Sequence, residues 1–476
     1  MGRPFSYRPL PKMGSQPVLL PDPVANWAQQ FPHKTALYTD SEHWTWAKLD
    51  EMAHCMANKL EAQGFRYGDV VAICAATQPS YIALLLACLR KGIVCCPLNP
   101  RLPSAVLQEQ AKWVNAKALY RDEDLNQDLP PIIERHITQN WSLQQYATLV
   151  FTSGSSGKPK AALHSLGNHY WSAHGSQANI AFASDDCWLL TLPLFHVSGL
   201  GIVFRCLFVG ASIRLTTSPE LALQSSPLPT HVSLVSTQVF RLLEAQAPLD
   251  RLKAVLLGGS AFPESLIMQA YQRKWPVFLS YGMTEMASQI ATTPPNAPLS
   301  CLLKTNGCPL PHREIRLAED GEIWVRGETR FLGYWQEDHL AQPFDEEGWF
   351  ATGDLGYLDK NGFLSVVGRK DNLFVSGGEN IQPEEIENHL RQFSGVAEAL
   401  VVPVPNERYG HRPVAFVRGK VSAQALFLAL SASLPRYKIP DLFLEWPLPE
   451  NTPDLKPNRR DFQLKALALL EKSPFE

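Results

Sequence analysis

The sequence LVFTSGSSGKPKA, residues 149–161, joins a short apolar run to a loop rich in Thr, Ser, Gly and Lys. The apolar run predicts a buried strand, and a glycine-rich loop after a strand is a common way to hold phosphate groups. Without side chains at Gly154 and Gly157, backbone N–H groups can approach phosphate oxygens closely. Hydroxyl and ammonium groups fill other loop positions: Thr152, Ser153, Ser155, Ser156, Lys158 and Lys160. The segment therefore predicts a site for a triphosphate.

This loop does not have the spacing of a P-loop. That motif places four residues between its two glycines and follows the second glycine with Lys and then Ser or Thr. Here two residues separate Gly154 from Gly157, and Lys158 is followed by Pro159. A phosphorylating P-loop ATPase is therefore disfavoured. A Ser/Gly surface linker is the structural alternative for the loop taken alone.

Outside the loop, helical and strand patterns alternate along the chain. A helical pattern at 49–64 ends in glycine and is followed by the apolar run 69–74; residues 81–99 repeat this order, and 231–259 resume it. Such alternation predicts parallel strands joined by helical crossovers, which is an α/β architecture. Residues 321–368 differ, because GEIWVRG, GYW and FLSVVGR are short strand patterns separated by turn residues. They predict a smaller antiparallel subdomain.

Three parts are predicted along the 476 residues: a loose leader at 1–24, a large α/β domain at 25–369 and a small α+β domain at 370–476. The leader is rich in proline and lacks the apolar core of a secretory signal. The small domain begins with a helical pattern at 383–393, and strand patterns and a further helical pattern follow. The domain boundary is predicted at 369–371.

Bulk composition excludes several classes of protein. The formal net charge is −3, with 19% charged residues, so no polyanion-binding surface is indicated and nucleic acid is not an expected partner. The longest apolar run, 81–89, is far shorter than the roughly 20 residues of a membrane-spanning helix. Nine cysteines without a C-x-x-C pair predict reduced thiols in a cytoplasmic protein.

Six later segments, in this order along the chain, resemble motifs of the adenylate-forming superfamily, which includes acyl-CoA synthetases, peptide-synthetase adenylation domains and beetle luciferases. They are GGSAFP (258–263), YGMTE (281–285), TGD (352–354), GRKDNLFVSGGENIQPEEIE (368–387), SLPRYKIP (433–440) and TPDLKPNR (452–459). The resemblance covers residues 25–465. Within the superfamily, PLFHVSGLGIVFRCLFVGA (193–211) and LFVSGGENIQPEEIE (373–387) look closest to the members that activate o-succinylbenzoate in menaquinone biosynthesis.

The resemblance implies an AMP-forming acid–thiol ligase. A carboxylate would attack the α-phosphorus of ATP, pyrophosphate would leave, and the acyl group would pass to coenzyme A, with Mg²⁺ as cofactor. This chemistry needs positioning and charge stabilisation and no protein nucleophile. Three alternatives stay open: another acyl- or aryl-CoA synthetase, an enzyme that loads a separate carrier protein, and an inactive adenylate-binding regulator. The sequence does not predict the oligomeric state, and a homo-oligomer is compatible with it.

By this resemblance, several residues would bind the nucleotide. Thr284 would contact the α-phosphate, and Glu285 would hold Mg²⁺, which prefers oxygen ligands. Asp354 would accept hydrogen bonds from the ribose hydroxyls, and Arg369 could add a donor. The adenine-binding turn and the neighbouring aromatic motif would supply Gly258, Gly259, Ser260, Tyr281 and Gly282. Each of these residues has a structural alternative as a turn, cap or surface residue.

The C-terminal domain would contribute to both half-reactions. Lys456 matches a lysine that reaches the substrate carboxylate and the α-phosphate, although Leu455 stands where the family has glycine and Pro457 follows. Arg459 and Lys465 are the substitutes if Lys456 is displaced. Gly377 and Gly378 match the segment that lines the pantetheine tunnel, and Asp371 matches the hinge about which the domain moves. These assignments follow from the resemblance alone.

Four residues are candidates for the acid pocket. His196 matches a position beside the acyl group in the family, yet a single His in an apolar stretch is as often a core residue. Arg205 stands alone in an apolar helical pattern, where an unpaired buried charge is costly. Its partner is either an internal Asp or Glu or the second carboxylate of a diacid substrate such as o-succinylbenzoate, unless the side chain reaches the surface. Ser233 and Thr237 are further candidates for the same pocket.

Overall fold

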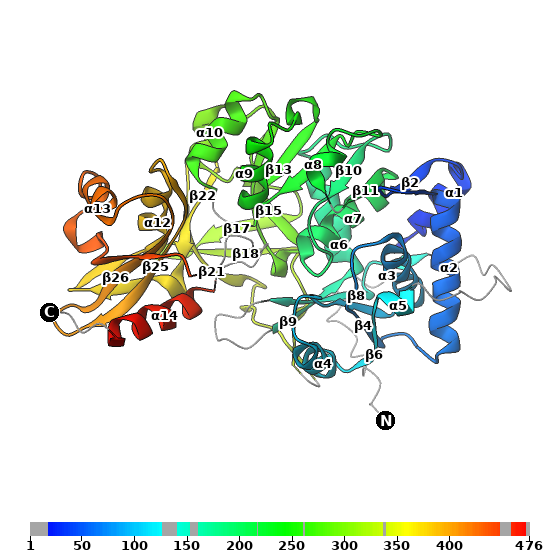
Figure 1. The fold of residues 1–476 in the computed structure, drawn as a ribbon. Coiled ribbons are helices and arrows are strands. Elements are labelled where there is room, and N and C mark those ends of the chain that lie inside the picture. The colour runs from blue at the N-terminus through cyan, green and yellow to red at the C-terminus, as the bar shows by residue number, and fades with distance from the viewer. Residues whose placement is uncertain are drawn as a thin grey trace.

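The computed structural model describes residues 18–125, 140–152, 160–216, 218–259, 262–336, 339–447 and 458–472. A large body carries two mixed sheets, a smaller antiparallel sheet and most of the helices, and a small C-terminal domain lies at one side (Figure 1). In the described part of the chain no helix is long and apolar enough to cross a membrane. All nine cysteines are free thiols.

The nine-stranded sheet has a parallel centre and antiparallel edges. Strands β14, β13, β12, β10, β11 and β2 run parallel to their neighbours, and β15, β16 and β3 add antiparallel pairs. In sheet order the strands are β16 (Cys308–Pro309), β15 (Ser288–Thr292), β14 (Val277–Met283), β13 (Ala254–Leu257), β12 (His231–Leu234), β10 (Cys187–Leu190), β11 (Ser212–Leu215), β2 (Thr35–Tyr38) and β3 (His43–Thr45).

The seven-stranded sheet contains the strands on both sides of the phosphate loop. Strands β8 and β9 pair antiparallel across that loop, whose residues 153–159 lie outside the described residues. In sheet order the strands are β20 (His339–Ala341), β19 (Gly333–Gln336), β9 (Lys160–Ser165), β8 (Tyr146–Thr152), β5 (Val94–Pro97), β4 (Val70–Ile73) and β6 (Ala116–Tyr120). The predicted parallel strands form the centres of both large sheets, and antiparallel hairpins extend them into mixed sheets.

Helices pack between and around the two sheets. The largest core cluster joins apolar side chains of both sheets to those of α2, α3 and α7, and α2 packs on α1 and α3 at the outer edge of the body (Figure 1). The helices of the large body are α1 (Pro23–Gln30), α2 (Trp46–Ala62), α3 (Pro79–Lys91), α4 (Ser104–Trp113), α5 (Asp122–Leu125), α6 (Leu166–Gln177), α7 (Val197–Val209), α8 (Pro219–Ala222), α9 (Ser236–Glu244), α10 (Glu264–Gln272) and α11 (Leu299–Lys304).

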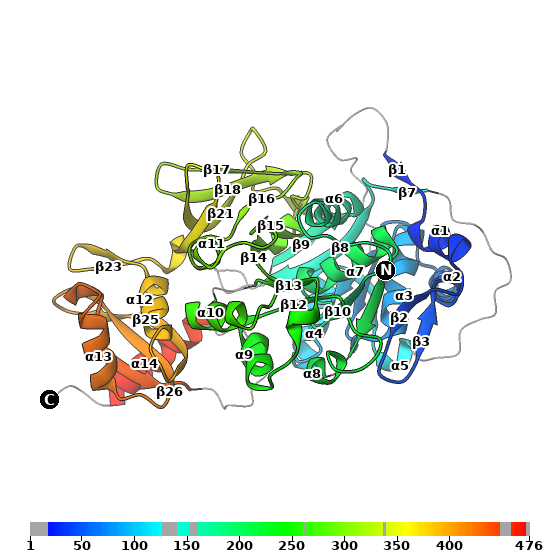
Figure 2. The same cartoon turned by 90° about the horizontal axis from the view of Figure 1, so that it is seen from above.

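The antiparallel subdomain is a four-stranded sheet, and it gathers at one edge of the body in Figure 2. Its strands are β17 (Arg313–Leu317), β18 (Glu322–Gly327), β21 (Phe350–Leu358) and β22 (Leu364–Arg369). The placement of GYW in this subdomain is wrong. Those residues form β19, which pairs with β9 of the seven-stranded sheet because Trp335 packs into that sheet's apolar cluster.

The structure describes residues 18–24 of the expected leader, and these seven residues are part of the fold. Leu19–Leu20 form β1, which pairs with β7 (Trp141–Ser142), and α1 begins at Pro23. Asp22 caps α1 and also forms a buried ion pair with Arg90 of α3, with Oδ2 2.7 Å from Nε. A buried charge pair of this kind fixes the entry of the chain into the fold.

The C-terminal domain begins beyond β22. A short 3₁₀ turn, η3 (Lys370–Asn372), follows Arg369 at the predicted boundary, and a separate sheet then starts. Its elements are β23 (Phe374–Ser376), β24 (Glu379–Ile381), α12 (Pro383–Arg391), β25 (Val396–Asn406), β26 (Gly410–Gly419), α13 (Ala423–Ser431), η4 (Arg436–Lys438), β27 (Leu442–Glu445) and α14 (Arg459–Lys472). The predicted α+β pattern is confirmed for this part of the chain.

Three buried histidines mark the core of the body. Burial lowers the pKa of His164 to about 4, that of His169 well below its ordinary value, and that of His231. All three side chains are neutral at pH 7. Below pH 6.5 the unfolded chain takes up protons at these positions while the folded protein does not, so stability that is present above pH 6.5 is lost as the pH falls.

Replacing His169 by Phe should reduce this loss. The His169 ring stacks on Phe204 with centroids 4.2 Å apart, so a phenyl ring keeps the packing and removes one titrating group. Each such histidine removes about 1.4 kcal/mol of unfolding free energy per pH unit below its unfolded pKa. Between pH 7 and pH 5, His169→Phe should lose about 1 to 2 kcal/mol less than wild type by urea denaturation. The same change at exposed His43 is the control, and equal losses in both variants would contradict the prediction.

Candidate active site

The site is built around the turn after β14. Strand β14 ends at Met283, the 3₁₀ turn Thr284–Met286 follows, and Ala287 with φ of +49° reverses the chain into β15. This reversal buries Glu285, which is 7% exposed, and its backbone carbonyl accepts a hydrogen bond from the N–H of Phe331 at 2.8 Å. The turn thereby presents a carboxylate inside the fold.

Glu285 is held by Tyr334 of β19. The Tyr334 hydroxyl donates to Oε1 of Glu285 at 2.7 Å, and burial raises the pKa of this carboxyl above its ordinary value although that hydrogen bond opposes the rise. Among the described residues no group of three or more His, Cys, Asp or Glu side chains could hold a metal ion. A cation at Glu285 would therefore take most of its oxygen ligands from phosphate groups and water, as Mg²⁺ commonly does.

A second cluster joins Tyr281, Asp354 and Arg369. The Tyr281 hydroxyl donates to Oδ2 of Asp354 at 2.6 Å, and Nη1 of Arg369 donates to Oδ1 at 3.1 Å. Asp354 on β21 faces Arg369 on β22 in the strand register. Burial and the neighbouring carboxylate raise the pKa of Tyr281 well above its usual value, so its hydroxyl remains a donor. The cluster links the nine-stranded sheet to the antiparallel sheet that leads into the C-terminal domain.

Glycines open the space beside this cluster. Gly258 and Gly259 follow β13, and Gly259 has a φ of +89°, which favours glycine. A Cβ atom at Gly258 would lie 3.5 Å from the carbonyl oxygen of Ser280, which is an ordinary contact. The surface next to Gly258 is therefore formed by backbone atoms. Gly282 differs, because a Cβ there would lie 2.0 Å from the carbonyl of Ser288. Gly282 is therefore needed for the close approach of β14 and β15.

The phosphate loop is seen at its two ends. Thr152 ends β8 and Lys160 begins β9, and Nζ of Lys160 lies 4.9 Å from the centre of the Tyr334 ring, next to Glu285. The loop therefore starts and finishes beside the Glu285 turn. Eight predicted site residues lie outside the described residues: Ser153, Gly154, Ser155, Ser156, Gly157, Lys158, Ser260 and Lys456.

Arg205 is fully buried on α7. Its Nη2 donates to Oε1 of Gln289 at 2.7 Å, its guanidinium lies 5.1 Å from the Trp188 ring centre, and its Nε has no hydrogen-bond partner among the described residues. Burial lowers the pKa of Arg205 to about 10. No described Asp or Glu forms an ion pair with it, so the internal acidic partner considered above is absent from the described residues.

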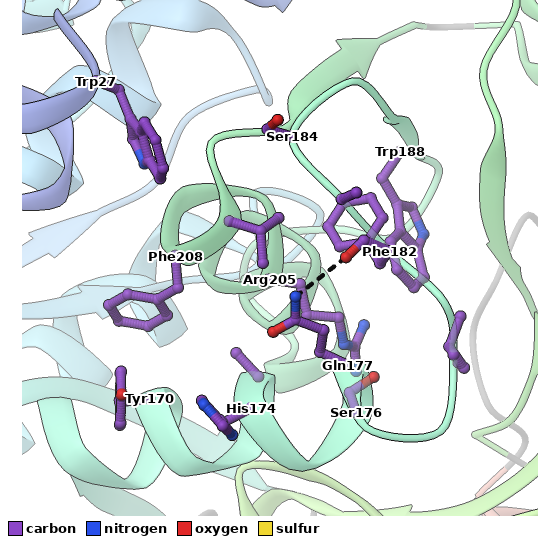
Figure 3. Close-up of a pocket in the computed structure, with 14 residues that line it drawn as sticks. Trp27, Tyr170, His174, Ser176, Gln177, Phe182, Ser184, Trp188, Arg205 and Phe208 are labelled. Carbon is purple, nitrogen blue, oxygen red and sulfur yellow. Dashed lines mark hydrogen bonds between the residues drawn. The ribbon is translucent and has the colours of Figure 1, made fainter. Parts of the chain in front are cut away.

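A cavity of about 440 Å³ lies on one side of Arg205, between α1, α6 and α7. Figure 3 shows the Gln177 side chain and its hydrogen bond to the carbonyl of Phe182 in this cavity, with aromatic rings around it. Five aromatic side chains contribute to its walls, from Trp27, Tyr170, Phe182, Trp188 and Phe208. Arg205 is the fixed positive charge of this lining.

The other predicted pocket residues are Ser233, His196 and Thr237, and Ser233 contacts Trp188. Ser233 accepts a hydrogen bond from the Trp188 indole N–H at 3.1 Å, so Ser233 and Arg205 both contact the Trp188 side chain. His196 is exposed at the N-cap of α7, and Thr237 lies in the first turn of α9. The structure thus brings Ser233 and Arg205 together, and it places His196 two helical turns before Arg205 on α7.

The C-terminal candidates lie in separate elements. Gly377 and Gly378 form the turn between β23 and β24 with φ of +60° and +90°. Asp371 lies in η3, and its Oδ2 accepts a hydrogen bond from Nη2 of Arg369 at 3.3 Å. Arg459, the first substitute for Lys456, forms an ion pair within the C-terminal domain, with Nη1 2.5 Å from Oε1 of Glu387. Lys465, the other substitute, is exposed on α14.

Three contacting residues were missed by the sequence reasoning: Tyr334, Gln289 and His164. Tyr334 was included in a strand pattern without a role, and the Gln289 side chain reaches Arg205 from 84 residues away. His164 donates to the carbonyl of Thr284 across 120 residues. The aromatic motif GYW was the one sequence signal that could have singled out Tyr334.

Comparisons with known proteins are consistent across the chain. The model of the family described as AMP-binding enzyme matches residues 24–335, and that of the AMP-binding enzyme C-terminal domain matches 385–451. A 2-succinylbenzoate–CoA ligase of Salmonella typhimurium is 38% identical over 450 residues, which are 93% of this chain and 97% of the relative. The ligase of the same name from Escherichia coli is 36% identical, over 91% and 94% of the two chains.

Solved structures of relatives have the same fold. A variant of Escherichia coli MenE with bound OSB-AMS is 33% identical, covers 95% of this chain and 99% of its own, and has a TM-score of 0.83. MenE from Bacillus subtilis in complex with ATP and magnesium ion is 32% identical, with coverages of 90% and 96% and a TM-score of 0.82. The predicted fold class, a large α/β domain followed by a small C-terminal domain, is confirmed, with mixed in place of parallel sheets.

Replacing Asp354 by Asn should weaken nucleotide binding. The Asp354 carboxylate accepts hydrogen bonds from Tyr281 and Arg369, and ribose hydroxyls would also need an acceptor at this position. An amide replaces one of the two acceptor oxygens with an NH₂ donor. We expect the Kd for AMP, measured by calorimetry, to rise about 10- to 100-fold, as for loss of a charged hydrogen bond. Asp359→Asn, in the turn that joins the same two strands, is the matched control. Unchanged affinity in Asp354→Asn with an intact fold would remove Asp354 from the site.

Proposed function

Because the chain belongs to the AMP-binding enzyme family, we propose that it is an ATP-dependent ligase that converts 2-succinylbenzoate and coenzyme A to 2-succinylbenzoyl-CoA. AMP and pyrophosphate are the other products. Curated relatives with 32% to 38% identity over most of the chain carry the name 2-succinylbenzoate–CoA ligase. The solved relative from Bacillus subtilis in complex with the acyl-adenylate intermediate OSB-AMP supports the same chemistry.

The observation that carries the substrate assignment is the buried guanidinium of Arg205. A buried cation without a counter-ion is strongly unfavourable, and the described residues offer Arg205 an amide oxygen of Gln289 but no carboxylate. 2-Succinylbenzoate has two carboxylates. One is activated at the α-phosphorus, and the ring carboxylate would remain to pair with Arg205 through charge-assisted hydrogen bonds.

The remaining residues support the adenylation step. The carboxylate of Glu285 is a hard oxygen group suited to Mg²⁺, which would neutralise charge on the phosphates of ATP as pyrophosphate leaves, and Thr284 would contact the α-phosphate. Asp354 would orient the ribose, with Arg369 beside it. Lys456 would stabilise the charge that develops at the α-phosphate. His196, at the N-cap of α7, would lie near the acyl group.

The two half-reactions would use different faces of the C-terminal domain. Lys456 serves adenylation, whereas Gly377 and Gly378 would line the channel for the pantetheine chain during thioester formation. Both segments belong to the domain that follows the η3 turn, and rotation at Asp371 would exchange them. A role in menaquinone biosynthesis and a cytoplasmic location belong to the same proposal, and nine free thiols agree with a reducing compartment.

Pyrophosphate release tests the proposed reaction directly. Release should require 2-succinylbenzoate, and 2-succinylbenzoyl-CoA should accumulate in equal amount when coenzyme A is present. Adenylate formation without any thioester on coenzyme A would favour loading of a separate carrier protein instead. No pyrophosphate release with 2-succinylbenzoate, but release with another aryl acid, would overturn the substrate assignment.

Replacing Arg205 by Met should discriminate between two acids. The comparison substrate is 4-oxo-4-phenylbutanoate, which is 2-succinylbenzoate without its ring carboxylate. The ratio of kcat/KM values for the two acids should shift against 2-succinylbenzoate by about 10- to 100-fold, since that substrate alone loses a charged hydrogen bond. Buried Arg214, which donates to the carbonyl of Ser225 at 2.9 Å, provides the control Arg214→Met. An equal loss for both acids in Arg205→Met would make Arg205 structural.

Replacing Asp371 by Pro should separate the half-reactions. Proline fixes φ near −65° and removes a backbone donor, so the η3 turn can no longer pass freely between two conformations. If the variant is held in the adenylating pose, single-turnover assays should show acyl-adenylate formed at nearly the normal rate and its transfer to coenzyme A slowed severely. Equal effects on both half-reactions with the fold intact, or no effect on either, would refute the two-pose mechanism at Asp371.

A further inference from the structure

His164 connects the strand after the phosphate loop to the Glu285 turn. It lies on β9, four residues after Lys160, and its side chain is 0% exposed. Its Nε2 is 2.7 Å from the backbone carbonyl of Thr284, the residue immediately before Glu285. None of the roles assigned above to the adenylation site involves this imidazole.

The hydrogen positions on His164 follow from its partners. A carbonyl oxygen can only accept, so Nε2 of His164 carries the proton and, in the neutral ring, Nδ1 is a bare acceptor. Nδ1 faces the hydroxyl of Thr148 at 3.5 Å, and that hydroxyl lies 2.8 Å from Nε2 of His169. With one proton to donate, Thr148 donates to His164 and accepts from His169. The Nδ1 atom of His169 has no hydrogen-bond partner among the described residues. In this arrangement it carries a lone pair, so no buried N–H group is left without an acceptor.

The result is a directed series of hydrogen bonds, from His169 through Thr148 and His164 to the carbonyl of Thr284. Every side chain in it is at most 1% exposed, so water does not compete for these bonds. On the other side of the turn, β19 holds Glu285 through the Phe331 N–H just before the strand and the Tyr334 hydroxyl within it. Because β9 and β19 are paired, one strand pair fixes both residues of the turn.

We propose that His164 is a positioning residue for adenylation: its hydrogen bond to the Thr284 carbonyl sets the Thr284–Glu285 turn in register with the phosphate loop that precedes β9. The inference rests on the proposed function. His164 acts through the backbone of Thr284 and does not itself reach the nucleotide. A shift of the turn would move the Glu285 carboxylate relative to the phosphates of ATP. It would therefore slow adenylation, the half-reaction in which pyrophosphate leaves.

The test uses two substitutions at His164 and one elsewhere. His164→Gln keeps an amide N–H near the position of Nε2, whereas His164→Leu removes the donor and leaves the carbonyl unpaired. Gln145→Leu is the matched control: Gln145 is also buried, and its Nε2 donates to the carbonyl of Leu89 at 2.8 Å, outside the proposed site. Each full-length variant is assayed for both half-reactions with 2-succinylbenzoate, for its Mg²⁺ requirement and for thermal stability.

We expect His164→Leu to slow adenylation at saturating ATP about 10-fold or more, and to raise the Mg²⁺ concentration needed for half-maximal rate. Transfer from supplied acyl-adenylate to coenzyme A should stay within about two-fold of wild type, and His164→Gln should recover most of the lost rate. Gln145→Leu should not slow one half-reaction selectively.

Two results would overturn the inference: equal losses in both half-reactions of His164→Leu, or a His164→Gln variant as slow in adenylation as His164→Leu at equal stability. If His164→Leu does not fold, His164→Gln decides: a selective slowing of adenylation with a raised Mg²⁺ requirement supports the inference, and equal losses in both half-reactions, or no change in either, overturn it. Wild-type enzyme that does not adenylate 2-succinylbenzoate would refute the proposed function instead, and the same comparison would then be made with ATP–Mg²⁺ binding.

Discussion

The protein keeps a carboxylate, that of Glu285, buried at a chain reversal between two large sheets, and much of the architecture serves to hold it there. Burial opposes ionisation, which is why the pKa of Glu285 is raised, and the Tyr334 hydroxyl is the contact that offsets this. A carboxylate in such a place is stabilised further by a bound cation. The antiparallel extension of both sheets, by β15 and by β9 with β19, is what closes the backbone around the turn.

The large body also buries two cations, Arg313 and Arg205, whose guanidinium groups need hydrogen-bond acceptors. Arg313 donates to the carbonyls of Gln289 and Pro311 at 2.6 and 2.7 Å, and Gly175 makes room for it, since a Cβ there would lie 2.1 Å from its Nη1. Its guanidinium is thus satisfied by fixed backbone oxygens. Arg205 has one amide oxygen and an orphaned Nε, and its charge also lowers the pKa of Arg313, which burial brings to about 9. Two neighbouring buried cations with no described carboxylate between them form a local excess of positive charge that an acidic substrate would neutralise.

The sequence predicted the motif residues and missed their partners, for a physical reason. Asp354 and Glu285 were predicted because their segments resemble superfamily motifs, and Arg205 because it is a lone charge in an apolar helical pattern. Tyr334 reaches Glu285 across 49 residues, and His164 reaches Thr284 across 120, so their roles depend on how strands pair in space. GYW was assigned to the wrong sheet because a short strand pattern does not encode its partner. The loop at 153–159 and Lys456 lie outside the described residues, and their roles stay predictions.

The ion pairs at the junction between the domains differ from those inside the C-terminal domain. Lys370 bridges to Asp320 at 2.6 Å and to Glu322 at 2.8 Å across the junction. The Lys370–Asp320 pair is exposed, so it contributes little to stability and can be exchanged for water, whereas the Glu322 carboxylate is nearly buried. Within the C-terminal domain, Arg459 instead joins α14 to the nearly buried Glu387 of α12. Loss of one partner of such a buried pair is far more unfavourable than loss of an exposed one. In the proposed two-pose mechanism, the C-terminal domain would therefore rotate about residues 369–371 as one rigid unit.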